Sequence, residues 1–219
     1  MVYSSTHTSS TYYTEKETAM NGELNMGRIS RESLWTLEHY SRIRNQFRAE
    51  VMAHKKLRRI ALGDHITLFF EDEKTIRYQI QEMLRIEKTF EEEGIQDELD
   101  AYNPLIPDGR NFKATMMIEY PDPEVRKVEL RKLKGVESRV WVQVEGREKV
   151  WAIADEDLIR ENEEKTSSVH FMRFELDEDM AAALKYGVSL SIGVDHPAYT
   201  VKIDPLAADV RASLVKDLA

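Results

Sequence analysis

Residues 165–176, KTSSVHFMRFEL, alternate between apolar and other side chains as a β-strand with one buried face does. In such a strand His170 shares a face with Met172, Phe174 and Leu176. A titratable imidazole on an apolar face needs a partner, because an unpaired buried polar group costs about 1 to 3 kcal/mol. The stretch therefore predicts a half-buried strand and a polar partner for His170.

The rest of the chain mixes helical and strand periods without a regular β-α-β alternation. The sequence predicts helices at 34–37, 42–57, 73–93, 96–102, 123–133, 156–163 and 177–187, and further strands at 58–62, 65–71, 114–120, 139–145, 150–154, 189–194 and 199–203. Gly63-Asp64 predicts a hairpin turn, and Gly94 is the expected C-terminal cap of the longest helix. The fold class indicated is α+β, with several helices packed on a largely antiparallel mixed sheet.

Composition limits the class of protein. The chain has 219 residues and 42% hydrophobic content, enough for one sizeable core. It contains no cysteine, which excludes disulfides, thiolate metal sites and cysteine nucleophiles. We expect a cytoplasmic protein, because no apolar run is long enough for a membrane span and no secretion signal is evident. The formal net charge of −9 argues against general nucleic-acid binding.

The N-terminal region differs in character from the remainder. Residues 1–26 are rich in Ser, Thr and Tyr and show no apolar periodicity. We therefore expect a disordered extension over 1–26 and a single α+β domain over 27–219.

A basic run ends the predicted second helix. It consists of Lys55, Lys56, Arg58 and Arg59 around Leu57. Cations at a helix C-terminus interact favourably with the helix dipole, so a solvated helix end is one interpretation. The other is a site that contacts an anion or an acidic partner, to which Arg85 could also contribute.

Three predicted elements each direct one titratable side chain toward apolar neighbours. On the 73–93 helix, Glu87 falls near the centre of the stripe formed by Ile76, Ile80, Met83, Ile86 and Phe90. On the preceding helix, His54 lies in the stripe that contains Phe47. With His170 these residues make a set of two imidazoles and one carboxylate, and Glu82 on the helix flank could add a second carboxylate.

Two imidazoles and one carboxylate are the ligand set of mononuclear non-haem iron and related divalent metal sites. The sequence thus offers His54, Glu87 and His170 as candidate ligands of a divalent metal such as iron or zinc. The alternative is structural: a buried His–Glu or Glu–Arg pair that satisfies each polar group without metal. No spacing motif decides between them, since the three residues lie on separate elements.

Several longer motifs resemble a bacterial family known as domain-of-unknown-function family 3501. The motifs are His54-Lys-Lys with Arg58-Arg59, residues 79–85 (QIQEMLR), residues 100–109 (DAYNPLIPDG) and residues 166–176. The resemblance covers nearly everything after residue 26. It implies no established activity, but members of the family often lie in the genome beside rubrerythrin-like proteins and iron–sulfur oxidoreductases. It thereby implies a role in peroxide or oxygen stress and a redox protein as partner.

Two functions follow as hypotheses. One is a metal-binding protein for redox or peroxide-stress chemistry, with His54, Glu87 and His170 as ligands. The other is a non-enzymatic accessory protein that docks onto an iron–sulfur or rubrerythrin-like partner. In either case a homodimer is the expected assembly, because two-fold dimers are the commonest oligomers.

Overall fold

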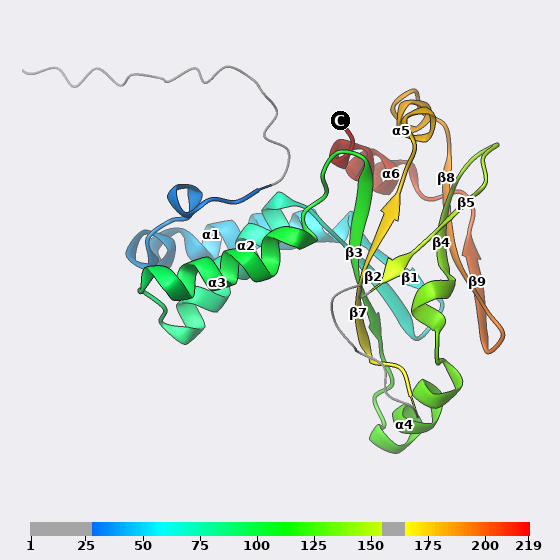
Figure 1. The fold of residues 1–219 in the computed structure, drawn as a ribbon, viewed down its shortest axis with the longest axis horizontal. Helices are drawn as coiled ribbons and strands as arrows, with labels where there is room; N and C mark the ends of the chain where they lie inside the picture. Colours follow the sequence, from blue (N-terminus) through cyan, green and yellow to red (C-terminus); the bar gives the residue numbers. More distant parts are fainter. Residues whose placement is uncertain (1–27, 155–164) are drawn as a thin grey trace, which may run out of the picture.

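The structure is a computed structural model that describes residues 28–154 and 165–219. The α+β class is confirmed: a helical arm projects from a body built on two β-sheets (Figure 1). The predicted extension over 1–26 and the predicted helix over 156–163 lie outside the described residues. Within the part of the chain that is described, no helix is both long and apolar enough to cross a membrane.

The arm consists of α1 (Leu37–Lys56), α2 (Glu73–Glu87) and α3 (Glu92–Tyr102), preceded by a 3-10 turn, η1 (Arg31–Ser33). Each of the two longer helices begins at a residue whose side chain accepts a backbone N–H, Thr36 for α1 and Asp72 for α2. The arm has a hydrophobic cluster of its own, composed of Ile29, Leu34, Ile76, Ile80, Leu84, Ile95, Leu99 and Ile106.

The end of α2 differs from the prediction. The helix stops at Glu87 because Lys88 adopts a left-handed conformation (φ 54°), and Gly94 lies inside α3 rather than capping α2. The turn at Lys88 folds α3 back along α2. This packing buries Ile95 and Leu99 against the apolar side of α2, which a continuous helix to residue 93 could not do.

The strands form two separate sheets in which every strand pair is antiparallel. The first has the order β1-β2-β3-β7-β6 and the second the order β5-β4-β8-β9. The strands are β1 (Arg59–Leu62), β2 (Ile66–Glu71), β3 (Asn111–Ile118), β4 (Val140–Val144), β5 (Lys149–Trp151), β6 (Ile153–Ala154), β7 (Val169–Glu175), β8 (Leu190–His196) and β9 (Tyr199–Ile203). The strand predicted to carry His170 is thus β7, and the prediction of alternating burial along it is confirmed.

One hydrophobic cluster joins the two sheets. It includes Leu68, Met116 and Phe174 from the first sheet and Val142 and Ile192 from the second. At one end of the body lie α5 (Glu178–Lys185) and α6 (Ala208–Leu214), and at the other end lies α4 (Pro123–Lys132) (Figure 1). The short 3-10 turns are η2 (Asn103–Leu105), η3 (Val136–Arg139) and η4 (Val215–Asp217).

The β1–β2 hairpin turns at Gly63-Asp64, as predicted, and it meets β9 there. The Tyr199 hydroxyl donates to the Leu62 carbonyl (2.5 Å) and accepts from the His65 amide (3.2 Å). Gly63 has φ +70°, and a Cβ at this position would lie 2.5 Å from the Tyr199 oxygen. Glycine is therefore required both by the turn and by the tyrosine packed on it.

Candidate functional site

A group of buried and half-buried charged side chains lies where the arm joins the body, and we call it the arm joint: His54, Arg58, Asp72 and Asp217. His54 ends α1, and its Nε2 lies 2.5 Å from Oδ2 of Asp72, the residue that caps α2. The other Asp72 oxygen accepts from the Thr75 amide (2.9 Å). One carboxylate thereby ties the end of α1 to the start of α2.

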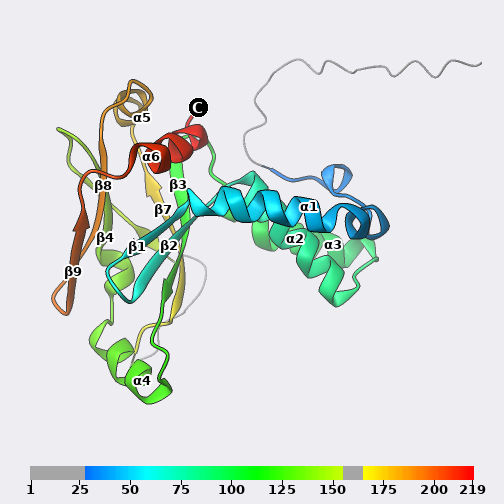
Figure 2. The ribbon, with the colours of Figure 1, turned by 180° about the vertical axis from the view of Figure 1, so that it is seen from behind.

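Arg58 is the centre of the arm joint and is only 1% exposed. Its guanidinium donates to the backbone carbonyls of Phe70 (3.0 Å), Glu71 (3.0 Å) and Ser213 (3.1 Å), and it also pairs with the Asp217 carboxylate. Seen from behind, α6 lies beside the junction of α1 and β1, where these bonds form (Figure 2). The interpretation of Arg58 as a contact for an external anion or partner is wrong, because its donors are used inside the protein.

The remaining cations proposed as anion contacts lie apart from this buried group. Lys55 stands 6.0 Å from the centre of the Tyr78 ring, and Arg59 stands 5.9 Å from the centre of the Phe69 ring. Lys56 and Arg59 are exposed. Arg85 lies on the arm and pairs with Glu82 (3.4 Å). The five cations therefore do not form one anion site.

The two carboxyl groups of the arm joint have shifted pKa values in opposite directions. Burial opposes ionisation of Asp72, but the charge of Arg58, the Thr75 amide and His54 outweigh it and lower the pKa. Burial raises the pKa of Asp217 to about 7, with Asp72 adding to the effect and Arg58 opposing it. The cluster thus contains a carboxyl group that exchanges its proton near neutral pH.

The inward-facing carboxylate of α2 is Glu82, not Glu87. Glu82 accepts from the Tyr40 hydroxyl (2.7 Å) and forms two hydrogen bonds with Arg44 (both 2.7 Å). The hydrogen bonds from Arg44, together with those from Tyr40 and Arg85, lower the pKa of Glu82 to about 2 against the effect of burial. This helix thus carries a half-buried Glu–Arg pair, five residues before Glu87.

The prediction that Glu87 faces the core is wrong. Glu87 is exposed and is the last residue of α2. Because an α-helix rises about 1.5 Å per residue, Glu87 lies about 22 Å along α2 from the Asp72 end, where His54 binds. The error came from the helix face: Ile86 and Phe90, which defined the predicted stripe, are 61% and 66% exposed.

His170 is buried on β7 and has the partner that its position requires. Its Nε2 lies 2.9 Å from the Thr166 hydroxyl, 3.1 Å from the Ser167 carbonyl and 3.8 Å from a Glu137 carboxylate oxygen. The Thr166 hydroxyl in turn donates to Glu137 (3.0 Å). The Nε2 atom carries a proton in this geometry, because the Ser167 carbonyl can only accept a hydrogen bond.

Strand register separates His170 from the arm joint. Met116 pairs with His170 on one side and with Leu68 on the other, and Asp72 follows Leu68 by four residues. With about 3.3 Å per residue and about 4.8 Å between strands, His170 and Asp72 are about 16 Å apart. His54, Glu87 and His170 therefore lie at three different places, and the described residues contain no group of three or more His, Asp or Glu that could hold a metal ion.

We expect His170→Ala to lower the free energy of unfolding by about 1 to 3 kcal/mol, since it removes one partner each from Thr166 and the Ser167 carbonyl and leaves a small cavity. His39→Ala, which truncates an exposed imidazole on α1, is the matched control and should change stability by less than about 0.5 kcal/mol. Urea denaturation of the three proteins measures both values. Equal stability of wild type and His170→Ala would contradict the structural role.

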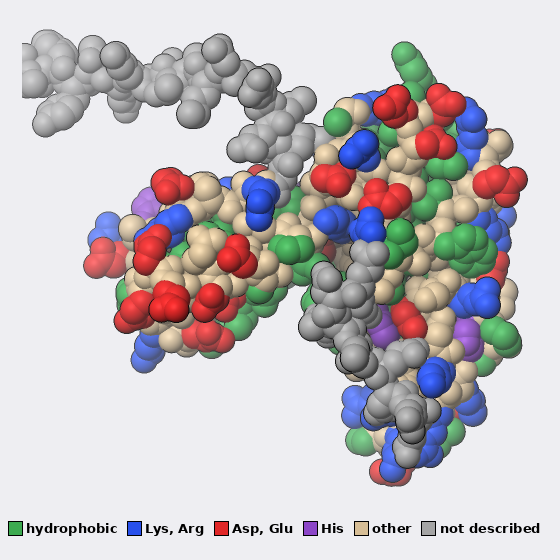
Figure 3. Space-filling view, in the orientation of Figure 1, with side chains coloured by type: hydrophobic (Ala, Val, Ile, Leu, Met, Phe, Trp, Pro, Cys, Tyr) green, Lys and Arg blue, Asp and Glu red, His purple; other side chains and the backbone are tan. Residues whose placement is uncertain are grey.

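Away from the arm joint, the free end of the arm is an exposed surface that we call the arm tip (residues 86–98). Ile86 and Phe90 are two of its exposed large hydrophobic side chains. The same segment carries six carboxylates and one lysine, and Figure 3 shows acidic side chains gathered over this part of the arm. Burial together with the charges of Glu87 and Asp97 raises the pKa of Glu98, so these carboxylates are close enough to repel one another.

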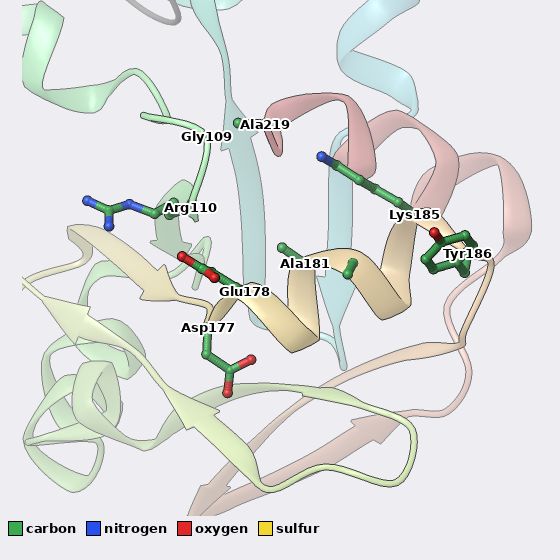
Figure 4. Close-up of a pocket in the computed structure, with 9 residues that line it drawn as sticks. Gly109, Arg110, Asp177, Glu178, Ala181, Lys185, Tyr186 and Ala219 are labelled. Carbon is green, nitrogen blue, oxygen red and sulfur yellow. The ribbon is translucent and has the colours of Figure 1, made fainter.

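A hollow of about 570 Å³ lies between α5 and the end of the chain. Figure 4 shows Arg110 and Lys185 on opposite sides of it, with Ala181 and Glu178 between them. The aromatic ring of Tyr186 is 91% exposed. The cations do not converge on a common point, so this hollow is a weaker candidate than the arm tip.

Sequence reasoning missed Asp217, Glu137 and the exposure of Ile86 and Phe90 at the arm tip. Asp217 and Glu137 had no local signal, because each meets its partner from a distant part of the chain. The arm tip did have one: the three consecutive glutamates directly after Phe90 are unfavourable beside a buried helix face.

Comparison with known proteins places the chain in a family but gives no activity. A crystal structure of a novel protein of unknown function from Burkholderia pseudomallei is 55% identical and superposes with a TM-score of 0.83, covering 87% of this chain and 99% of that one. No curated protein matches the chain. The family model described as "Protein of unknown function (DUF3501)" matches residues 28–218. Since that match spans most of the sequence, the chain belongs to the DUF3501 family.

Proposed function

We propose that this protein is a non-enzymatic accessory protein that docks, through its arm tip, onto a partner with a basic and partly apolar surface. The observation that carries the proposal is the exposure of Ile86 and Phe90 within a ring of carboxylates. An exposed apolar pair with a charged rim has the composition of a protein interface, in which aromatic side chains supply most of the affinity.

The structure of the arm supports this role, because the arm is packed internally and is held to the body at its base. It has its own hydrophobic cluster, and the arm joint fixes its base to β2 and α6 through Arg58. The carboxylates of the arm tip would steer a basic partner toward the surface, which makes association faster at low salt. The partner class to test is the iron–sulfur or rubrerythrin-like redox protein that the family resemblance implies.

We expect Ile86→Ser combined with Phe90→Ser to weaken partner binding at least tenfold, which corresponds to about 1.4 kcal/mol. Stability should stay within about 0.5 kcal/mol of wild type, because both side chains are already exposed. The measurement is calorimetric titration of the purified protein with a rubrerythrin-like protein and with an iron–sulfur oxidoreductase of the same organism.

Tyr186→Ser is the matched control, since it removes a large and even more exposed side chain from the body rather than the arm. It should leave binding unchanged. The proposal would be contradicted if binding survived the double arm-tip substitution. It would also be contradicted if the wild type bound neither of the two redox proteins.

A further inference from the structure

The surface of α4 carries the opposite charge to the arm tip. Val125 and Val128 are each 48% exposed, and helical spacing puts them on the same side of α4 as Lys132. Along its length α4 holds four basic residues and two acidic ones. We call Val125, Val128 and Lys132, together with the exposed Lys127 on the flank of the helix, the α4 surface; Lys132 also pairs with Glu129 (2.7 Å).

The arm tip and the α4 surface complement each other in both components of an interface. Each presents two exposed apolar side chains, Ile86 and Phe90 on one and Val125 and Val128 on the other. The arm tip is strongly acidic and the α4 surface is basic, so the two surfaces attract each other when they meet, which offsets the repulsion among like charges within each surface. One chain therefore contains both halves of a possible contact.

We propose that the arm tip of one copy binds the α4 surface of a second copy, and that the two copies form a closed two-fold dimer. The arm and α4 extend from the body in different directions (Figure 1). A two-fold axis midway between the two surfaces exchanges them, so that both contacts form at once. The inference rests on the proposed role of the arm tip as a docking surface but not on the redox partner.

The physical character of the contact predicts how the dimer behaves. Each patch is small, and the second contact forms within an already joined pair, which strengthens the assembly without a larger surface. Exposed charges are screened over about 8 Å at physiological ionic strength, so the dimer should weaken as salt rises. Occupation of the arm tip by α4 also makes self-association and partner binding mutually exclusive.

The decisive test is complementation between two charge-reversed variants of the full chain. Lys127→Glu with Lys132→Glu makes both surfaces acidic. The four substitutions Glu87→Lys, Glu91→Lys, Glu93→Lys and Asp97→Lys, all at exposed positions, turn the arm tip basic, so that both surfaces are basic. Sedimentation equilibrium at low salt should show the wild type as a dimer and each variant alone as dissociating at least tenfold more readily. An equimolar mixture of the two variants should restore dimers, because both contacts in the mixed pair are then attractive.

Three results would overturn the inference: a wild type that stays monomeric, variants that dimerise as well as the wild type, or a mixture that fails to recover dimers. Higher oligomers that grow with concentration would contradict the closed two-fold arrangement. The redox-partner titration, repeated with Lys127→Glu and Lys132→Glu, reads out the proposed function separately, since this variant keeps an unaltered arm tip.

Discussion

Replacing Arg58 with methionine is expected to lower the free energy of unfolding by about 3 to 5 kcal/mol, because four buried acceptors lose their donor at once. The substitution leaves Asp217 buried without its cation and leaves the carbonyls of Phe70, Glu71 and Ser213 without their donor. The arm joint would lose a side chain that contacts β2, α6 and η4 together. Urea denaturation followed by circular dichroism measures the change.

The control for this prediction is the adjacent residue. Arg59→Met removes an exposed guanidinium from the same strand and should cost less than about 1 kcal/mol. Adding Asp217→Leu to Arg58→Met should recover part of the loss, because the buried carboxyl group that has lost its donor is then gone. If Arg58→Met and Arg59→Met were equally stable, Arg58 would not be the centre of the joint.

Replacing Glu82 with glutamine is expected to cost on the order of 2 to 3 kcal/mol at pH 7 and little near pH 2. The pKa of Glu82 is lowered from 4.5 to about 2, chiefly by the hydrogen bonds from Arg44. A depressed folded-state pKa contributes stability that is present above pH 4.5 and is lost as the pH falls through about 2. The stability difference between wild type and Glu82→Gln should therefore shrink in that window.

The contribution of Asp217 to stability changes with pH in the opposite direction to that of Glu82. The effect of Glu82 therefore has to be measured as the difference between wild type and variant. The pKa of Asp217 is raised from 3.8 to about 7, mainly by burial, so its contribution to stability declines as the pH rises from about 4 to 7. Both proteins contain Asp217, and their difference isolates Glu82. Glu50→Gln, at a carboxylate that is 50% exposed, should show no such pH dependence. A Glu82→Gln deficit that is constant from pH 2 to 7 would contradict the assignment.

The helices and strands were largely predictable away from their ends, because the sequence patterns that indicate them are local. The alternation of β7 along residues 169–175 and the turn at Gly63-Asp64 both appear in the structure as expected. The end of α2 was not predictable from Gly94, because the left-handed turn at Lys88 gains its advantage from the packing of α3, which begins five residues after α2 ends.

The candidate sites were harder to predict than the elements for a related physical reason. His170 was correctly placed in the interior, since strand period 2 decides which face a residue takes. For α2 the choice between Glu82 and Glu87 depended on where α1 and α3 pack on the helix, which the pattern of apolar residues left ambiguous. The arm-tip residues Ile86 and Phe90 were assigned to the core for the same reason.

What the sequence by itself determined is the α+β class, the inward position of His170 and the excess of negative charge, since these depend on composition and on neighbours within a few residues. Only the tertiary structure decided that Arg58 lies inside the protein with Asp217, a residue 159 positions further along the chain. Local pattern cannot show such a pair, because the burial of a charge is tolerated only when a distant partner compensates its desolvation. The same long-range packing left Ile86 and Phe90 exposed at the arm tip and separated His54, Glu87 and His170.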